Sequence, residues 1–418
     1  MSDEVCSSEI SRCIDAKYYW YPESYTHIYP WPENVSHNRY IEKIEYRQLR
    51  GVDKLSTFNY YFLYGFEDLS HWLLWERSYY KKREKELKEL CDKHRKDDGR
   101  FDVLVPGSGG KDSIYVANEL KHKYGMHPVL TTWAPNMQTS QGIQNFNAWL
   151  DMGFANYMVY QNKQVHRLLT KLAFEELCHP FQPFIIGQKN MAPKLAAQLD
   201  IDLIMFGEHD AEFGVNMDRM NIPTMDLGFF TVDNNDISQI YLSGLPVTEL
   251  IDKYGLSLSD LEAYLPLDRE KFEGNNKEFH FYSYYKNWNF HDNYYYAVEN
   301  SNFLPASKRL EGSYDKYASM DDKIDWLHFY TFYTKFGIGR ATAASFQEIR
   351  AGVITRDEGI ALVKRFDGEF PAQYLKDCLD YLDITEQKFY DITDESRPDH
   401  LWKKEHGEWK LRQPIWKA

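Results

Sequence analysis

The residues from Phe101 to Tyr124 constrain the fold of this chain more than any other stretch. A short apolar run at 101–105 has the pattern of a buried strand, a glycine turn follows at 106–110, and apolar residues then recur at helical spacing. Such a unit is an anion site, because the free N–H groups of the first helical turn and the positive end of the helix dipole face whatever lies above the strand. Lys111 adds a positive charge. We therefore expect this turn to hold a nucleotide phosphate.

Spacing decides which kind of phosphate loop is present. The Walker form requires a glycine where Val105 stands and a serine or threonine where Asp112 stands. The dinucleotide form requires its third glycine at Asp112 as well. The segment 108–113, SGGKDS, instead matches in full the SGGxDS signature of the PP-loop ATP pyrophosphatases, and the chain resembles that superfamily. The resemblance implies cleavage of ATP between its α- and β-phosphates; a glycine turn without a ligand is the alternative.

Strands and helices alternate after the glycine turn. Apolar strand patterns recur at 129–133, 157–160 and 203–206, with single helices between them. This rhythm predicts an α/β fold, a parallel sheet with helices on both faces and right-handed crossovers. Because ligands of such sheets lie beyond the carboxyl ends of the strands, the turns 106–113, 131–136 and 207–210 should converge on one site.

The last two turns carry candidate binding residues. By the PP-loop resemblance, Thr131, Thr132 and Trp133 would lodge adenine and Gly207 would contact ATP. Glu208 and Asp210 are candidates for Mg²⁺ or for orienting an amine, and ordinary solvated loop acids are the alternative.

The strand–helix rhythm is lost beyond residue 214, where the pattern favours a mainly helical region. We therefore expect three parts: an aromatic-rich region at 1–84, the ATP pyrophosphatase domain at 85–214, and a substrate or partner region at 215–418. The aromatic run 280–296 fits either a substrate wall or half-buried packing. Lys335 and Arg340 flank a Gly-x-Gly turn that suits an anionic substrate, with two solvated cations on a surface turn as the alternative.

Composition excludes several classes of protein. A formal net charge of −14 and the lack of a long basic patch argue against nucleic acid as a partner. No stretch is apolar enough to span a membrane, and the acidic N-terminus does not resemble a secretory signal. The 5 scattered cysteines suit a reducing cytoplasm. Cys6 and Cys13 lack the spacing of a zinc knuckle, so we predict no zinc site.

A closer resemblance rests on seven motifs. The chain resembles the N-acetyl sugar amidotransferases of the PP-loop group, which make acetamidino sugars for bacterial lipopolysaccharide O-antigens and nonulosonic acid glycans. Family members usually begin with Cys-x-x-Cys pairs, which this chain lacks, so its exact substrate is open. The motifs are VPGSGGKDS (105–113), GEHDAEFG (207–214), YYYAVEN (294–300), EGSYDKY (311–317), DDKID (321–325), KFGIGRAT (335–342) and EIRAGVITRDEGIALVKRFDGEFP (348–371).

The resemblance implies an ATP- and Mg²⁺-dependent ligase reaction. The acetamido oxygen of a nucleotide-linked N-acetyl uronic acid or of a nonulosonic acid attacks the α-phosphorus, and ammonia then displaces AMP from the O-adenylyl imidate. Lys111 and the backbone of Gly109, Gly110 and Asp112 would hold pyrophosphate. Ser108 and Ser113 would donate to phosphate oxygens. Asp112 and Glu208 would bind Mg²⁺, while Lys335 and Arg340 would grip the α-phosphate or a sugar carboxylate.

Ammonia should come from a separate glutaminase, because position 2 is Ser and no nucleophile elbow surrounds Cys178. A homodimer is left open. The rival interpretations are a tRNA-modifying PP-loop enzyme, a nucleotide synthetase and a non-catalytic nucleotide-binding scaffold.

Overall fold

The computed structural model describes residues 69–209, 212, 221–226, 228, 231–232, 237–269 and 276–417. Its centre is a five-stranded sheet in the order β3-β2-β1-β4-β9, in which every neighbouring pair is parallel. The strands are β1 (Val103–Pro106), β2 (Pro128–Trp133), β3 (Asn156–Val159), β4 (Leu203–Phe206) and β9 (Glu278–Phe281). The predicted α/β architecture is confirmed.

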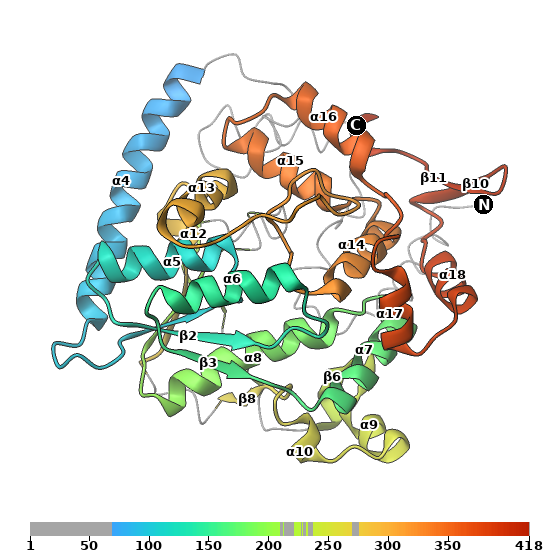
Figure 1. Cartoon of the computed structure of the whole chain (residues 1–418), viewed down its shortest axis with the longest axis horizontal. Helices are drawn as coiled ribbons and strands as arrows, with labels where there is room; N and C mark the ends of the chain where they lie inside the picture. The colour runs from blue at the N-terminus through green and yellow to red at the C-terminus, as the bar shows by residue number, and fades with distance from the viewer. Residues whose placement is uncertain are drawn as a thin grey trace, which may run out of the picture.

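Side chains alternate between the two faces of the sheet, and helices cover both faces (Figure 1). Val103 and Val105 of β1 belong to the core that contains α5 (Lys111–His122), whereas Leu104 between them packs on α8 (Gln182–Gln198). The first face also holds α4 (Leu69–His94), α6 (Ser140–Asp151), α12 (Tyr282–Tyr285) and α13 (Phe290–Asn300). α7 (Lys163–Leu177) packs on α8.

Strand order reverses beside β1. The chain proceeds outward from β1 through β2 to β3, and returns to place β4 on the other side of β1. The phosphate loop therefore leaves the sheet at its topological switch point, where open parallel sheets bind ligands. The fifth strand, β9, was not predicted, because its residues are only four in number and lie in an aromatic run without a strand period. The sheet thus continues beyond residue 214.

The C-terminal region is mainly helical, as predicted. It comprises α14 (Lys323–Phe336), α15 (Arg340–Arg350), α16 (Arg356–Phe366), α17 (Leu375–Leu382), α18 (Glu386–Glu395) and the hairpin β10 (Trp402–Glu405) and β11 (Glu408–Leu411). Thr355 and Glu358 form the expected capping box at the start of α16. Gly337 ends α14 with a φ of 69°.

Smaller elements connect β4 to β9. They are β5 (Thr231–Val232), β6 (Tyr241–Leu242), β7 (Leu245–Pro246), α9 (Val247–Tyr254), α10 (Leu258–Leu261) and β8 (Leu267–Asp268). Among the described residues, no helix is both long enough and apolar enough to cross a bilayer. Cys6, Cys13 and Asp210 lie outside the described residues.

Candidate active site

A cavity of about 460 Å³ lies at the carboxyl ends of β1 and β4. That volume is in the range of small-molecule sites. The phosphate loop forms one wall, and residues from the C-terminal region form the wall opposite. Polar and charged side chains from both walls face the space: Ser108, Lys111, Asp112, Ser113, Asn145, Gln188, Lys189, Glu208, Ser319, Asp321, Asp325, His328, Arg340 and Gln347.

The glycine turn leaves the start of α5 open to a ligand. Gly110 is the N-cap residue of α5, and no side chain caps the helix. Gly109 has a φ of 84°, and a Cβ there would lie 2.8 Å from the Cα of Phe146 on α6. Only glycine therefore allows the turn to pass this close to α6. Nothing lies within 4 Å of a Cβ added at Gly110, so the backbone above the helix is accessible.

Lys111 and Asp112 form an ion pair at the first turn of α5. The Lys111 side chain is buried, and Nδ2 of Asn293 on α13 donates to the other carboxylate oxygen of Asp112 at 2.8 Å. Ser113 donates from Oγ to the carbonyl of Gly110 at 3.0 Å. The charges of the loop are thus held in place by α13, which a sequence pattern could not indicate.

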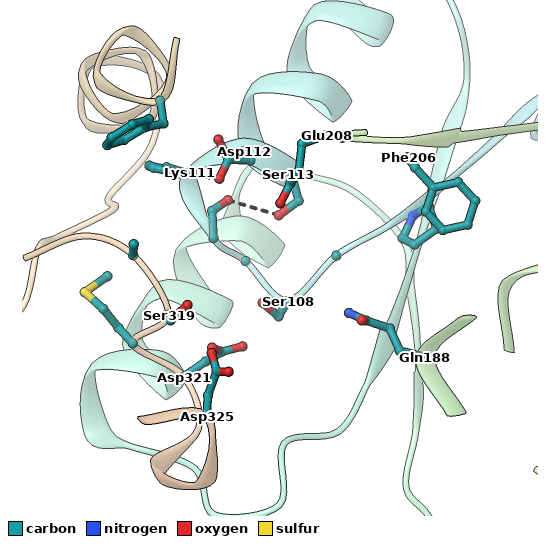
Figure 2. Close-up of a pocket in the computed structure, with 18 of the residues that line it drawn as sticks. Ser108, Lys111, Asp112, Ser113, Gln188, Phe206, Glu208, Ser319, Asp321 and Asp325 are labelled. Atoms are coloured by element: carbon teal, nitrogen blue, oxygen red, sulfur yellow. Dashed lines mark hydrogen bonds and ion pairs between the residues drawn. The ribbon is translucent and has the colours of Figure 1, made fainter. Parts of the chain in front are cut away.

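Glu208 follows β4 and lies beside the Asp112 carboxylate. The segment 207–209, which carries Glu208, is held by α12. Ser283 donates its N–H to the Gly207 carbonyl at 2.9 Å, and its hydroxyl accepts from the N–H of His209 at 3.0 Å. Burial, followed by repulsion from Asp112, raises the pKa of Glu208 to about 7. Figure 2 shows Asp112, Ser113 and Glu208 grouped at one end of the loop.

These two carboxylates fit a magnesium ion. A cation shared between two neighbouring carboxylates in an enclosed space relieves their mutual repulsion. The described residues contain no group of three or more His, Cys, Asp or Glu side chains that could hold a metal. Mg²⁺ commonly uses only one or two carboxylates together with phosphate oxygens and water, so the pair is sufficient beside a phosphate loop.

A second acidic group, Asp321 and Asp325, lies at the other end of the loop (Figure 2). Burial raises the pKa of Asp321, although the Ser108 hydroxyl donates to it. Burial and the charge of Asp321 raise the pKa of Asp325 to about 8. The sequence showed DDKID at 321–325 only as part of the family resemblance, because acids at a helix start usually serve as caps.

Arg340 reaches the cavity from the first residue of α15. Its positive charge lowers the pKa of both Glu208 and Asp325, although burial of each acid has the larger, opposite effect. Asp367 lies at the N-terminus of α15, where it accepts the N–H groups of Gly339 at 2.9 Å and Thr342 at 3.1 Å. Because this carboxylate already occupies the helix start, the Gly-x-Gly turn offers an anion chiefly the Arg340 side chain.

Lys335 does not join Arg340. Its Nζ donates to the carbonyl of Leu177 at 2.8 Å, and its buried side chain lines a separate small cavity with Cys178 and His179. α14 ends at Gly337, and the reversal of the chain there directs Lys335 and Arg340 to different places. The expectation that Lys335 grips a phosphate is therefore not carried forward.

Thr131, Thr132 and Trp133 do not line the cavity. Thr131 and Thr132 tie β2 to its surroundings: the Thr131 carbonyl accepts the N–H of Gly107 at 2.9 Å, and Oγ1 of Thr132 donates to the Gly107 carbonyl at 2.7 Å. Trp133 is in the core and packs against Tyr264. β2 is buried along its whole length, so these residues support the loop and do not form a wall for adenine.

An apolar surface that the sequence did not reveal lies on the same cavity. Phe181 and Phe184 of the α8 region stack with ring centroids 4.4 Å apart, and Phe206 and Phe281 meet across β4 and β9 at 6.2 Å. All four line the cavity. A purine ring suits such a surface.

Comparison with known proteins bears on the C-terminal region. Residues 311–415 match the family model described as LPS biosynthesis protein WbpG-like, C-terminal domain. The NMN synthetase from Francisella tularensis has 18% identity to this chain, and the match covers 33% of this chain and 56% of the synthetase with a TM-score of 0.26. That likeness is too slight to bear on fold or function. No curated protein matches the chain.

Proposed function

We propose that this protein is an AMP-forming, ATP-dependent amidotransferase that converts the N-acetyl group of a sugar to an acetamidino group. The observation that carries the proposal is the shared cavity. One wall is an SGGKDS phosphate loop, and the other comes from the segment similar to WbpG-like proteins of lipopolysaccharide biosynthesis. An amide carbon is a poor electrophile, so transfer of AMP to the amide oxygen creates the leaving group that ammonia needs.

The phosphate end of the cavity would serve the first step. Lys111, the N–H groups of Gly109, Gly110 and Asp112, and the hydroxyls of Ser108 and Ser113 would bind the outer phosphates. Asp112 and Glu208 would hold Mg²⁺, which neutralises charge on the departing pyrophosphate when bound. Gly207 would contact ATP through its backbone. The side chains would thus position the phosphates of ATP and neutralise their charge, which is the usual contribution of a protein to phosphoryl and adenylyl transfer.

The opposite wall would hold the sugar. Arg340 is the cation best placed for the α-phosphate or for a sugar carboxylate, because it lines the cavity near Glu208 and Asp325. Asp321 and Asp325 can accept hydrogen bonds from sugar hydroxyls or from the incoming nitrogen. Such a site accommodates a nucleotide-linked N-acetyl uronic acid or a nonulosonic acid.

Ammonia would be supplied by a separate glutaminase. Cys91, Cys178 and Cys378 are buried, and burial raises the pKa of each thiol, so none of the described cysteines is an activated nucleophile. The isolated chain should therefore use ammonium salts but not glutamine.

The test is an assay of the purified protein with ATP, Mg²⁺, ammonium and a panel of N-acetyl sugars. We expect AMP, pyrophosphate and a sugar product lighter by the difference between O and NH in the mass spectrum. Formation of ADP and orthophosphate would contradict the proposal, and so would product formation from a tRNA or a nucleotide acceptor in place of the sugar.

Two variants of one helix sharpen the assay. Lys111→Ala should lower pyrophosphate release by about 10²–10³-fold, because it removes a buried cation from the developing charge. Lys121→Ala changes a half-buried lysine in the last turn of the same helix, which does not line the cavity, and should retain wild-type activity. Equal rates of pyrophosphate release by the two variants would show that Lys111 and the phosphate loop take no part in ATP cleavage.

A further inference from the structure

Three side chains, those of Tyr317, His291 and Glu348, follow one another away from the cavity wall. Tyr317 lines the cavity, and its hydroxyl lies 2.6 Å from Nδ1 of His291 in the first turn of α13. Nε2 of His291 lies 2.7 Å from Oε1 of Glu348 on α15. The three residues come from three different elements, and two of them belong to the WbpG-like segment.

We propose that Tyr317, His291 and Glu348 form a proton relay that removes a proton from the attacking ammonia. This inference rests on the amidotransferase function proposed above, because it assigns the proton acceptor of its second step. In the sequence, His291 sits in an aromatic run and the other two residues are far away, so no local motif marks the relay.

Oε1 of Glu348 lies 2.7 Å from Nε2 of His291 but makes no aligned hydrogen bond with it, so this carboxylate acts on the imidazole through its charge. We place the resting proton of the imidazole on Nε2. Nδ1 then carries a lone pair and accepts the Tyr317 hydroxyl proton. The remaining lone pair of the Tyr317 oxygen can take a proton from a ligand in the cavity. The Glu348 carboxylate lies where it can stabilise the imidazolium that forms when His291 takes up the proton.

The surroundings of His291 allow the proton to pass from its ring to water. The Glu348 side chain is 2% exposed, whereas that of His291 is 29% exposed and can release the proton to solvent. Tyr294 stacks on Tyr317 with ring centroids 4.3 Å apart and fixes its orientation.

The other titratable groups around the relay are Asp315, Tyr314 and Tyr295. Asp315 is committed to the backbone, since it accepts the N–H groups of Tyr317 at 3.0 Å and Ala318 at 2.9 Å. It therefore positions the Tyr317 turn and has no place in the relay. Tyr314 contacts the Glu348 side chain, and Tyr295 is largely exposed.

The second half-reaction joins ammonia to the adenylylated amide carbon. The ammonia lone pair forms a C–N bond to the N-protonated O-adenylyl imidate, which gives a tetrahedral centre that bears –NH₃⁺. One proton passes from this nitrogen to the Tyr317 oxygen while the Tyr317 proton passes to Nδ1 of His291. The C–O bond then breaks with its electron pair on AMP, and the sugar product is an acetamidinium ion. General base help of this kind typically contributes about 10²–10⁴-fold to a rate.

The test separates the two half-reactions. Adenylylation is followed by exchange of labelled pyrophosphate into ATP without ammonia, and amination is followed by acetamidino sugar formation at a constant concentration of free NH₃. We expect Tyr317→Phe and His291→Gln to lower amination by about 10²–10⁴-fold while exchange stays within a few-fold of wild type. Tyr295→Phe, a neighbouring exposed tyrosine, should change neither rate.

Glu348→Gln supplies a readout that a merely structural role would not move. It keeps the size of the side chain and removes the charge that stabilises the imidazolium, so it should lower amination while exchange stays near wild type. Wild-type amination rates in Tyr317→Phe and His291→Gln would overturn the relay. Absence of exchange and of product with wild-type protein would instead refute the proposed function.

Discussion

The enclosed charged residues whose pKa is shifted divide into two kinds, according to what their side chains face. Glu208, Asp321 and Asp325 face a cavity that a polar ligand can fill, whereas Lys335 is enclosed by protein atoms. In both cases burial is the largest cause of the shifted pKa. The difference is that the first group faces a space in which a cation or substrate can bind, whereas Lys335 lies against the Leu177 carbonyl and Cys178.

We predict that the Mg²⁺ requirement of the enzyme depends on the protonation of Glu208. Its pKa of about 7 means that the carboxyl is largely protonated in acid and must lose that proton to bind a metal. Apparent Mg²⁺ affinity should therefore fall by up to about tenfold for each pH unit below about 7. Titration of pyrophosphate release with Mg²⁺ across this range checks the prediction.

Glu208→Gln should bind Mg²⁺ weakly and lose this pH dependence, whereas Glu89→Gln on the exposed face of α4 should behave as wild type. A Mg²⁺ affinity that is independent of pH in the wild type would remove Glu208 from the metal site.

Lys335 gives a prediction about stability. Burial lowers its pKa to about 8, so the unfolded chain binds the proton more tightly than the folded one. The free energy of unfolding should therefore rise with pH between about 8 and about 10.5, by at most about 3 kcal/mol from this residue.

Lys335→Met keeps the volume of the side chain and removes the charge. Below about pH 8 the variant should therefore be the more stable protein, and its advantage in unfolding free energy should shrink as the pH rises from about 8 to about 10.5. Denaturant melts at several pH values measure this difference. ATP turnover by Lys335→Met should stay near wild type; a large loss would return Lys335 to the active site.

At the scale of elements, the site depends on helix starts that are used differently. α5 begins without a side-chain cap and is therefore available to phosphate, whereas α15 is capped by Asp367 and presents chiefly the Arg340 side chain. Both starts follow glycines and looked equivalent as sequence patterns.

We predict that Asp367→Ala destabilises the protein and weakens substrate binding. Two backbone N–H groups and the Thr342 hydroxyl lose their acceptor, at a cost of about 1–3 kcal/mol. Arg340 lies between the two residues that Asp367 holds, so its side chain should lose its fixed position and the KM for sugar or ATP should rise. Thr355→Ala removes the exposed cap of α16 and is the control, with a loss of about 1 kcal/mol and unchanged KM. Thermal unfolding and steady-state kinetics compare the two; an unchanged KM in Asp367→Ala would separate the cap from the site.

At the scale of the whole molecule, one set of hydrogen bonds joins the two walls of the cavity. We call this set, between the turn after β2 and residues 320–324, the seam. The turn after β2 is hydrogen-bonded to residues 320–324: Thr139 donates its N–H to the Asp321 carbonyl at 3.1 Å, and Lys323 donates to the Met137 carbonyl at 3.0 Å. Asp322, which is 1% exposed, accepts the N–H groups of Asn136, of Met137 at 3.3 Å and of Ile324 at 2.9 Å.

We predict that Asp322→Ala loosens both walls together. Three buried backbone donors would lose their acceptor, which should lower the free energy of unfolding by about 2–4 kcal/mol in a single transition. Asp377→Ala, which breaks only the surface pair with Lys323, should cost at most about 1 kcal/mol. Denaturant unfolding followed by far-ultraviolet circular dichroism measures both. Separate transitions in wild type, or equal losses in the two variants, would contradict a shared seam.

The sequence by itself determined the phosphate loop, the parallel sheet around it and the helical C-terminal region, because these depend on local spacing: glycines at fixed offsets and apolar residues at period two or at helical period. It did not determine which distant residues face the loop. β9 was missed because it is only four residues long and lies in an aromatic run without a strand period. Lys335 and Thr131–Trp133 were assigned to the site although the tertiary structure directs them elsewhere. Asp321, Asp325 and Tyr317 stood in family motifs without a role, and His291 in an aromatic run, until the structure placed them beside the cavity. Side-chain direction at a site depends on packing between elements far apart in the chain, and only the folded molecule specifies that packing.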